Sequence, residues 1–367
     1  MRGRRWFLTV ALLLHLPLFV YPVVRLGDWL GSPGWITILV LLPLVTSQYL
    51  SRFVLTNQKA IGAGLYRTFA SFWLGLSPVL LMTLLLFEVL VAGGMFAEQE
   101  AAMMVISISM MAALVGVLAA MMPRVRRVQL IANHLSMPVR FVQISDVHIG
   151  SRSSSFLESI VYRIIQHQPD FVCITGDLVD ARDLSETQLR SLRALPMPVY
   201  YTTGNHERYE DLDNILERLE RLGVNVMRNT TMDFSDEVQI LGIDDADHPT
   251  QVREQLSGLE VDPNRYSILL YHRPVGLEDA AAAGVDLMVS GHTHNGQIFP
   301  FRILVQRMFK YMKGLYQHGR THLYVSQGTG TWGPVMRVGT RSEITLFELS
   351  PAIAEEEPLA MAAGTGD

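Results

Sequence analysis

The distribution of apolar residues divides the chain into two parts. Up to about residue 122, long apolar stretches follow one another with few charges between them and almost no amphipathic period. After Pro138, short β-branched runs alternate with amphipathic stretches of helical period. The first pattern is typical of helices that cross a membrane, and the second is typical of a soluble α/β domain.

Four apolar stretches in the first part each come close to the roughly 20 residues that span a hydrocarbon core. They cover residues 6–24, 35–50, 69–91 and 101–122. A buried core helix could explain any one of them, but four in succession predict a transmembrane region with four helices, at residues 1–127. No small-residue cleavage site follows the basic, apolar start, so we interpret it as the first helix and not as a cleaved signal peptide.

Positive charges recur on every second side of the four stretches. The side that we assign to the cytoplasm carries Arg2, Arg4, Arg5, Arg52, Lys59, Arg67, Arg124, Arg126 and Arg127. The positive-inside rule then predicts a multi-pass protein of the inner (cytoplasmic) membrane, with everything after Pro123 facing the cytoplasm. His15 and Glu88 are the ionisable residues within the apolar stretches. Since transporters and channels rely on such residues, a region with so few of them is better interpreted as an anchor.

The second part, residues 138–350, predicts an α/β domain with helices packed on the faces of sheet. Strands are expected at residues 139–145, 171–175, 199–203, 238–243, 267–271, 287–290, 323–326 and 343–347. Helices are expected at residues 156–167, 185–195, 212–222, 250–256 and 275–283. The tail at residues 351–367 is rich in Ala and Glu, has no strong period, and is expected to be disordered.

Composition narrows the function classes. The formal net charge is −5, so the chain has no basic footprint and nucleic acid is not an expected partner. The single cysteine, Cys173, excludes an intramolecular disulfide and a multi-cysteine zinc site. Neither observation indicates an oligomeric state.

Polar residues gather directly after five of the expected strands. In chain order they are Asp146 and His148, then Asp177, then Asn205, His206 and Glu207, then His272, and finally His292 and His294. In open α/β sheets, ligands bind outside the carboxyl ends of strands, so these residues could converge on one site. Gly176, Gly204 and Gly291 accompany three of the clusters, and glycine permits close backbone approach.

The residue types in these clusters indicate metal binding. Imidazole, carboxylate and amide oxygen without cysteine suit divalent manganese, iron or zinc. At least seven such groups, more than one tetrahedral ion needs, are present, and a carboxylate can bridge, so two divalent metal ions are expected. Each short motif alone also occurs in ordinary turns. Their order and their placement at strand ends together favour a functional site.

In these motifs the sequence resembles the calcineurin-like metallophosphoesterase family. The resemblance covers about residues 139–348 and rests on Asp146-x-His148, Gly176-Asp177, Gly204-Asn205-His206-Glu207, His272 and Gly291-His292-Thr293-His294. The stretches Ser-Gly-His-Thr-His-Asn-Gly-Gln and Ser-Gln-Gly-Thr-Gly-Thr-Trp-Gly-Pro resemble a bacterial, membrane-associated branch of that family. The resemblance implies an αββα-type double β-sandwich joined to the four-helix transmembrane region.

The resemblance also implies a role for each residue. Asp146, His148 and His294 would hold one metal; Asn205, His272 and His292 would hold the other; Asp177 would bridge them. His206 would act at the phosphate as the catalytic residue without binding metal. Asp180 and Glu207 are interpreted as loop or supporting residues. Asp244 and Asp245 are expected to have a structural role.

The implied reaction is hydrolysis of a phosphoester by attack of a metal-bound hydroxide on phosphorus. A basic, apolar segment at residues 298–313 could lie in a membrane interface or pack as a cap on the domain or the helices. The interfacial interpretation favours a phosphodiester or pyrophosphate substrate that is lipid-linked, with UDP-diacylglucosamine as one candidate from the wider family. Two alternatives stay open: an anchored phosphatase or phosphodiesterase of soluble nucleotides, and a non-catalytic metal-binding sensor or scaffold.

Overall fold

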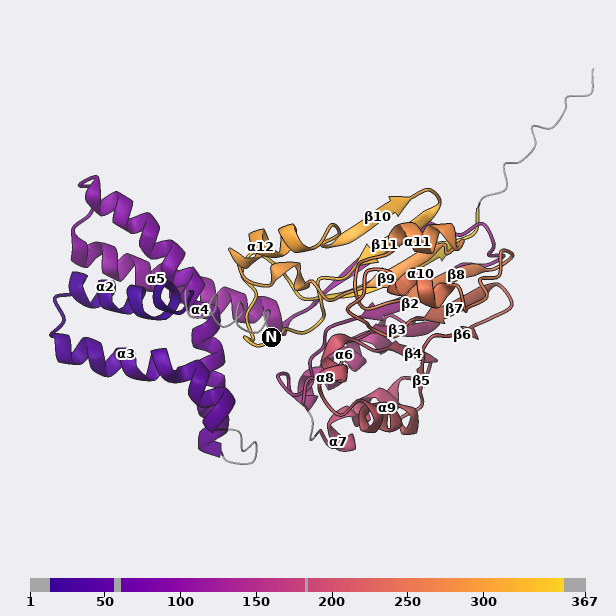
Figure 1. Cartoon of the computed structure of the whole chain (residues 1–367), viewed down its shortest axis with the longest axis horizontal. Coiled ribbons are helices and arrows are strands. Elements are labelled where there is room, and N and C mark those ends of the chain that lie inside the picture. The colour runs from indigo at the N-terminus through magenta and orange to yellow at the C-terminus, as the bar shows by residue number, and fades with distance from the viewer. Residues whose placement is uncertain (1–13, 56–60, 182–183, 353–367) are drawn as a thin grey trace, which may run out of the picture.

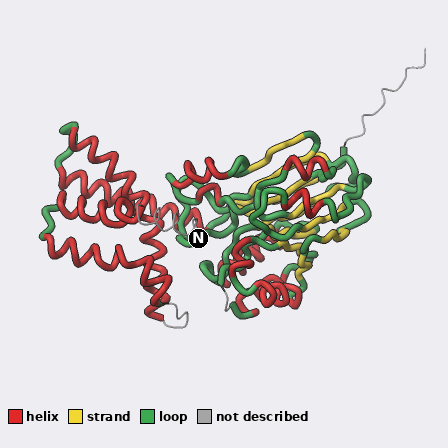
Figure 2. Tube along the Cα trace, in the orientation of Figure 1, coloured by secondary structure: helices red, strands yellow, loops and turns green. Residues whose placement is uncertain are grey.

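The computed structural model describes residues 14–55, 61–181 and 184–352, and it separates a bundle of helices from a domain built on two sheets. Figure 1 shows the bundle on the left and the two-sheet domain on the right. Figure 2 shows helices joined by loops in the bundle and the strands in the other part. The predicted tail falls almost entirely on residues outside the described ranges, as does the first half of the first predicted span.

The amino-terminal part contains four α-helices and two short π-helical segments among its described residues. Its elements are η1 Leu16–Val20, α2 Tyr21–Trp29, α3 Gly34–Tyr49, η2 Leu50–Val54, α4 Ile61–Ala92 and α5 Glu98–Met121. Two stretches, Gly62–Ala92 and Glu98–Met121, are long and apolar enough to cross a membrane, whereas the apolar helix Gly34–Tyr49 is shorter. The structure therefore supports two of the four predicted spans by length and composition, and the count of four stays a prediction.

The first sheet of the domain has six strands. Their order across the sheet is β1 Arg124–Ile131, β12 Glu343–Ser350, β2 Val139–Ile144, β3 Phe171–Thr175, β4 Val199–Thr202 and β5 Val224–Val226. All neighbouring pairs are parallel except β12 with β2. The carboxyl ends of β2, β3 and β4 consequently lie at one edge of the sheet.

The second sheet also has six strands. Their order is β10 Gly314–His318, β11 Thr321–Val325, β9 Leu287–Ser290, β8 Tyr266–Leu270, β7 Val238–Gly242 and β6 Thr230–Asp233. The four central strands run parallel, and the two outer strands are antiparallel to their neighbours. The predicted strands are all present, with bounds that match at residues 171–175 and 287–290 and otherwise differ by one to three residues.

Three apolar layers hold the domain together. Between the sheets, Phe141 stacks on Phe171 and on Phe347 with ring centroids 4.9 and 4.4 Å apart. The outer face of the first sheet buries one side of α6 and α9, and the outer face of the second buries α10 and α11. This arrangement of helix, sheet, sheet and helix confirms the predicted α/β two-sheet fold.

Short helices fill the connections of the domain. They are α6 Ser154–Gln166, α7 Glu186–Leu189, η3 Arg190–Ala194, α8 Asn205–Tyr209, α9 Leu212–Arg221, α10 Gln251–Leu256, α11 Leu277–Ala282, η4 His294–Gly296 and α12 Phe301–Met308. In α9 the apolar positions Ile215, Leu216 and Leu219 are buried, as the i, i+3, i+4 spacing predicts.

One strand begins ahead of the predicted domain start. We placed the transmembrane region up to residue 127 and began the domain at Pro138, but β1 at Arg124–Ile131 is a sheet strand that pairs with β12 along its whole length. The arginines of β1 mask its pattern, because this edge strand exposes Arg124, Arg126 and Arg127 and buries Val128 and Leu130. The sheet thus starts three residues after α5 ends.

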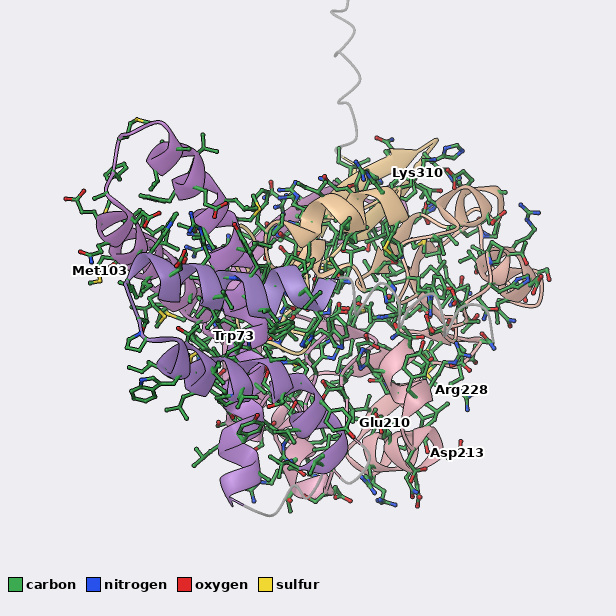
Figure 3. All side chains as sticks on the ribbon, turned by 60° about the vertical axis from the view of Figure 1, so that its left-hand side comes forward. Trp73, Met103, Glu210, Asp213, Arg228 and Lys310 are labelled. Carbon is green, nitrogen blue, oxygen red and sulfur yellow. The ribbon has the colours of Figure 1, made fainter. Side chains whose placement is uncertain are left out.

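The helices contact the domain through its last loop. Ser71 of α4 donates a hydrogen bond to the carbonyl of Gly333, and the backbone N–H of Arg337 donates to the carbonyl of Gly116 in α5. Met336 is fully buried in the apolar cluster of the bundle. A Cβ on Gly116 would come within 2.8 Å of Met336 and 3.1 Å of the Arg337 carbonyl, so glycine is what permits this close approach. In Figure 3, Trp73 lies on the bundle side and Arg228 on the domain side.

Candidate metal centre

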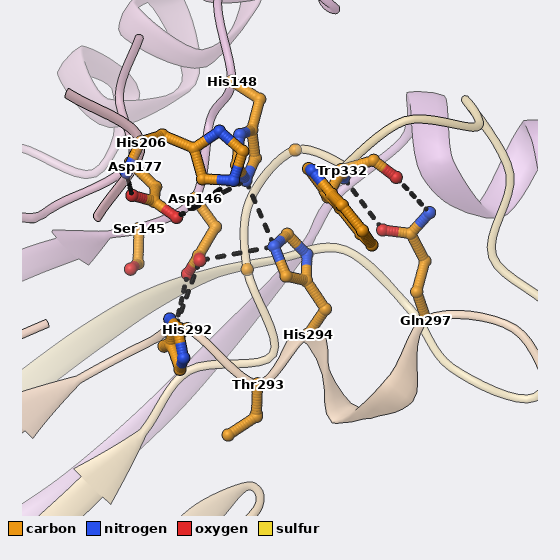
Figure 4. A network of polar contacts seen from close by, with 12 residues as sticks. Ser145, Asp146, His148, Asp177, His206, His292, Thr293, His294, Gln297 and Trp332 are labelled. Carbon is orange, nitrogen blue, oxygen red and sulfur yellow. Dashed lines mark hydrogen bonds and ion pairs between the residues drawn. The ribbon is translucent and has the colours of Figure 1, made fainter. Parts of the chain in front are cut away.

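The predicted site residues come from five different strand ends and gather in one place. Loops after β2, β3, β4, β8 and β9 carry them, and both sheets contribute. Figure 4 shows Asp146, His148, Asp177, His206 and His294 pointing toward one another. The topology explains this convergence, because the parallel central strands of both sheets deliver their carboxyl ends to the same edge.

One group of possible metal ligands consists of Asp146, His148 and His294. The Nε2 atoms of the two histidines are 3.1 Å apart, and His294 Nε2 is 3.3 Å from Asp146 Oδ1. All three residues are buried, and their ligand atoms lie within 4.8 Å of one another, so the group could hold one metal ion.

A second group consists of Asp177, His272 and His292. His272 Nε2 lies 3.2 Å from Asp177 Oδ2 and 3.0 Å from His292 Nδ1. These ligand atoms also lie within 4.8 Å of one another. Because Asp177 Oδ2 is in addition 4.0 Å from His148 Nε2, the carboxylate of Asp177 stands between the two groups.

Asn205 supports the fit of a cation to the second group. It is the first residue of α8, it is 9% exposed, and its Oδ1 atom is buried without a hydrogen-bond partner among the described residues. A buried amide oxygen without a partner costs free energy, and a metal ion would satisfy it. The next residue, His206, donates its backbone N–H to Asp177 Oδ1 at 2.9 Å, which fixes this turn beside the ligands.

The ionisation of the cluster suits metal binding. Burial is the main cause that lowers the pKa of His292 to about 3, and the positive charge of His272 is the second cause. Burial likewise lowers the pKa of His294 well below its ordinary value. Burial alone would raise the pKa of Asp177, but His272, His148 and His206 hold it well below the usual range. Neutral imidazoles and an ionised carboxylate are the forms that bind metal.

His272 and His148 differ from His292 and His294, because nearby carboxylates outweigh the effect of burial and raise their pKa. Burial lowers the pKa of His272, but the carboxylates of Asp177, Asp146 and Asp245 together raise it to about 10. Its Nδ1 atom lies 2.8 Å from the carbonyl oxygen of Thr175. A hydrogen bond to this carbonyl directs Nε2 toward Asp177 and the second group, as the partners of metal-ligating histidines commonly do.

The backbone of the ligand residues is unusual. Asp146, His148, Asp177, His292 and His294 all have positive φ, between 48° and 73°. Such values are uncommon for residues other than glycine and cost about 1–2 kcal/mol each. Backbone strain of this kind concentrates at functional sites, where the surrounding structure enforces it.

Two of the predicted glycines permit close packing around the ligands. A Cβ on Gly204 would lie 2.2 Å from Asp177 Oδ1, and a Cβ on Gly291 would lie 2.3 Å from Asp146 Oδ2. Any larger residue at these positions would therefore displace a carboxylate of the site. This is the close backbone approach that the sequence predicted.

Glu207 and Asp180 support the ligands without joining the groups. The buried carboxylate of Glu207 accepts hydrogen bonds from the backbone N–H groups of Asp177, Val179 and Gly204 at 3.0–3.1 Å. Asp180 Oδ2 lies 3.5 Å from His148 Nδ1. Both carboxylates thus position a ligand-bearing loop, in agreement with their interpretation as supporting residues.

Asp244 and Asp245 lie away from the ligand groups and bind arginines. Asp245 accepts hydrogen bonds from Arg273 at 2.6 Å and from Arg208 at 3.1 Å, and Asp244 accepts one from Arg228 at 2.8 Å. These ion pairs join loops of the two sheets. The structural role expected for both residues agrees with these contacts.

Sequence reasoning used the Ser-Gln-Gly-Thr-Gly-Thr-Trp-Gly-Pro motif after β11 for the family resemblance but did not predict a role for this segment in the site. The backbone N–H of Gly330 donates to the Asp146 carbonyl at 2.9 Å, so this segment forms a wall behind the first group. Arg337, which is 1% exposed, lies behind His294 and donates to its carbonyl at 3.2 Å. The high proportion of glycine and threonine in the motif is the sequence feature that could have identified this segment as part of the site.

Aromatic side chains stand at the edge of the cluster. The ring of Phe309 lies 5.3 Å from the ring of His292, and the rings of Tyr209 and Trp332 lie 6.3 and 6.4 Å from the ring of His206. Trp332 is 57% exposed and is held by hydrogen bonds between its backbone and the side chain of Gln297 (Figure 4). An apolar rim therefore borders the part of the site that His206 faces.

Comparison with known proteins agrees with this geometry. Residues 139–296 match the family described as calcineurin-like phosphoesterase. A metallophosphoesterase of Campylobacter jejuni is 33% identical over 238 residues, which covers 62% of this chain and 63% of the relative. One from Helicobacter pylori is 30% identical over 247 residues, covering 62% and 64%. The chain thus spans somewhat less than two thirds of the length of these two relatives.

A third relative extends the match into the helices. The transmembrane protein with metallophosphoesterase domain of Danio rerio is 31% identical over 364 residues, covering 86% of this chain and 80% of the relative. The long apolar helices α4 and α5 are therefore part of the similarity, and they point to membrane association. On the motif order, the two-sheet fold and these matches, the chain belongs to the metallophosphoesterase family.

Proposed function

We propose that this protein hydrolyses phosphoesters with two divalent metal ions and acts at the surface of the membrane in which its helices are anchored. The observation that carries the proposal is the pair of ligand groups that share the neighbourhood of Asp177. A non-catalytic sensor would not need two groups, the buried amide oxygen of Asn205 and a further histidine at the open side. The catalytic reading is therefore favoured over the scaffold.

Each residue of the cluster has a place in this proposal. Asp146, His148 and His294 would hold one ion, and Asn205, His272 and His292 the other, with Asp177 between them. The ions would be manganese, iron or zinc, as the oxygen and imidazole ligands favour. When bound, two such ions polarise a phosphoryl oxygen and lower the pKa of a bound water.

His206 would contact the substrate. Its side chain is 21% exposed, more than the side chains of His148, Asp177 and His272, and its Nε2 atom is 4.0 Å from Asp177 Oδ2. Burial lowers the pKa of His206, so a neutral imidazole faces the open side. A neutral imidazole with a proton on the outward nitrogen can donate a hydrogen bond to a phosphoryl or leaving oxygen.

The surroundings of the site favour a substrate held at a membrane. Helix α12 exposes Ile303, Leu304 and Met308, with 46, 50 and 74% of their surface accessible, while Phe301 at its start packs on the cluster of the bundle. The segment therefore packs against the helices, as one of the two interpretations expects, and its exposed apolar face supports the interfacial interpretation, which stays a proposal. Together with Phe309 and Trp332, this face suits a lipid-linked phosphodiester or pyrophosphate.

The orientation follows from the charges that flank the helices. Arg67 stands in the first turns of α4 and Arg124 three residues after the end of α5, whereas Glu98 and Glu100 stand at the start of α5, at the opposite end of this helical pair. The positive-inside rule then supports a catalytic domain that faces the cytoplasm from the inner membrane. We expect both the amino terminus and the two-sheet domain on that side.

A substrate panel tests the proposal. The full chain in neutral detergent, loaded with Mn²⁺, would be assayed with an aryl phosphomonoester, an aryl phosphodiester, a nucleotide pyrophosphate and a lipid-linked pyrophosphate. Asp177→Asn is the loss-of-function variant, and Asp213→Asn, an exposed carboxylate on α9, is its matched control.

The proposal predicts metal-dependent turnover that Asp177→Asn abolishes and Asp213→Asn retains, with preference for the lipid-linked substrate. Equal or better turnover of the soluble nucleotide would replace the lipid assignment by the nucleotide one. Tight binding of two ions without turnover of any substrate in the panel would leave the sensor as the better reading.

A further inference from the structure

A large cavity lies between α5 and the two-sheet domain, and none of the candidate metal ligands lines it. Its volume is about 1020 Å³, the upper end of the roughly 300–1,000 Å³ of pockets that take drug-sized ligands. One wall is the outer side of α5, where Ile108, Met111 and Val115 are 43, 61 and 54% exposed. The other wall comes from the start of β1 and from the loop before β12.

The wall from the domain is basic. Arg124, Arg126, Lys313 and Arg341 all line the cavity and are exposed, and none of them forms an ion pair with another residue in the described ranges. The single carboxylate among the described lining residues belongs to Glu343. It is 4% exposed, and its oxygens already accept hydrogen bonds from Tyr324 and Gln327.

The apolar wall and the basic wall together fit a ligand that has an apolar part and an anionic part. Ile108 and Gly116 are eight residues apart on α5, so the apolar wall is about 12 Å long at 1.5 Å per residue. No aromatic side chain is among the described residues that line the cavity, so a nucleotide base would have no ring on which to stack. An inorganic phosphate would contact the cations and leave the apolar wall bare.

We propose that this cavity binds one anionic phospholipid of the membrane, with its phosphate among Arg124, Arg126, Lys313 and Arg341 and an acyl chain along α5. We choose an anionic headgroup because of charge complementarity. Four cations without an ion-pair partner among the described residues line the cavity, and its one carboxylate is buried and hydrogen-bonded. The position carries the choice of a lipid, because α5 is apolar enough to cross a membrane and ends at Met121, three residues before the first of these cations.

The cavity reaches the back of the candidate metal centre. Arg337 and Gln327 line its inner end. Arg337 Nη2 lies 3.4 Å from His294 Nδ1, and Gln327 accepts a hydrogen bond from Asn295 at 2.8 Å. A bound lipid would therefore support the loop that carries His294 from behind. The inference rests on the proposed membrane location of α5, but it does not require that the protein be catalytic.

The test is lipid binding to the full chain in neutral detergent, measured by native mass spectrometry. Dioleoyl phosphatidylglycerol would be compared with dioleoyl phosphatidylcholine and with inorganic phosphate as competitor. The variant is Arg126→Ala with Arg341→Ala. The control is Arg127→Ala, because Arg127 neighbours Arg126 on β1 but pairs with Glu348 and does not line the cavity.

A cation beside an anionic headgroup strengthens binding by about fivefold, so the double variant should bind phosphatidylglycerol roughly 25-fold more weakly. Arg127→Ala should bind like the unaltered chain, and millimolar phosphate should not displace the lipid. Arg126→Lys, which keeps the charge, should retain most of the binding if the variants are folded.

Equal binding of the two lipids, or equal weakening by Arg127→Ala, would overturn the proposal, as would displacement by phosphate alone. Membrane fractionation of the full chain separates this failure from a failure of the membrane location. A chain that fractionates with membranes and shows no lipid preference refutes the cavity assignment while leaving the anchor in place.

Discussion

Replacing Glu207 by Gln should weaken metal binding without touching a ligand. Glu207 Oε2 accepts from the N–H groups of Asp177 and Gly204, and Oε1 accepts from the N–H of Val179. A glutamine can keep only one acceptor oxygen. If that oxygen serves the first two donors, the new amide group faces the N–H of Val179, which leaves a buried donor without a partner.

The magnitude follows from this count of hydrogen bonds. A buried donor left without a partner costs about 1–3 kcal/mol. Burial raises the pKa of Glu207 to about 7, so above that pH the remaining bonds also lose the assistance of its negative charge. We expect the free energy of unfolding to fall by about 2–3 kcal/mol, or roughly 5–10 °C in Tm for a domain of this size. Because the loop of Asp177 loosens, metal affinity should fall about 10- to 100-fold.

Two assays check this prediction. Competition with a chromogenic chelator measures Mn²⁺ affinity, and chemical unfolding with excess chelator measures the stability of the metal-free protein. Glu217→Gln is the control, because Glu217 lies on α9 with 63% of its side chain exposed and its ion pair among the described residues is with Arg221, one turn away. Unchanged metal affinity in Glu207→Gln, with or without loss of stability, would refute the positioning role of Glu207.

Three further predictions concern other parts of the molecule. His206→Ala should retain both metal ions but lose turnover by about 10²–10⁴-fold, measured by metal analysis and steady-state kinetics, and full turnover would exclude the assigned role. Since the folded pKa of His272 is raised to about 10, the metal-free protein gains stability from this group below its unfolded pKa of about 6.5 and loses it as pH rises through 10. Thermal unfolding with chelator at pH 6 and pH 9.5 measures this loss of stability. Calorimetry at pH 7 in buffers of different ionisation enthalpy should show proton release when Mn²⁺ displaces the proton of His272. Gly116→Leu should force α5 away from the loop of Met336 and lower stability in detergent by about 1–3 kcal/mol, whereas Gly62→Leu, where a Cβ meets nothing within 4 Å, should not.

The convergence of the candidate ligands could be predicted from the sequence because it depends on strand ends. Each ligand follows a run of apolar, β-branched residues that any strand pattern would detect, as in Phe171–Thr175 before Asp177. Parallel strands then bring their carboxyl ends together without any knowledge of side-chain contacts. The same reasoning identified Gly204 and Gly291 as points of close approach.

Other elements could not be predicted, for reasons that are physical. Strand β1 lies at the edge of its sheet and exposes Arg124, Arg126 and Arg127, so its charged positions hide it from a search for apolar runs. Helix α12 has no buried residue, and its apolar side chains face outward, so the usual relation between apolarity and burial fails there. The roles of Arg337 and Trp332 depend on contacts across the fold that spacing does not encode.

The left-handed backbone of the five ligand residues has a consequence for laboratory evolution. Glycine at any of these positions would relieve a conformation that costs an aspartate or histidine about 1–2 kcal/mol. Selection for heat resistance alone would therefore reward variants that have lost a ligand, and the most durable members of such a library would be inert. A screen that scores turnover at each round is the way to keep the centre while the rest of the chain is strengthened.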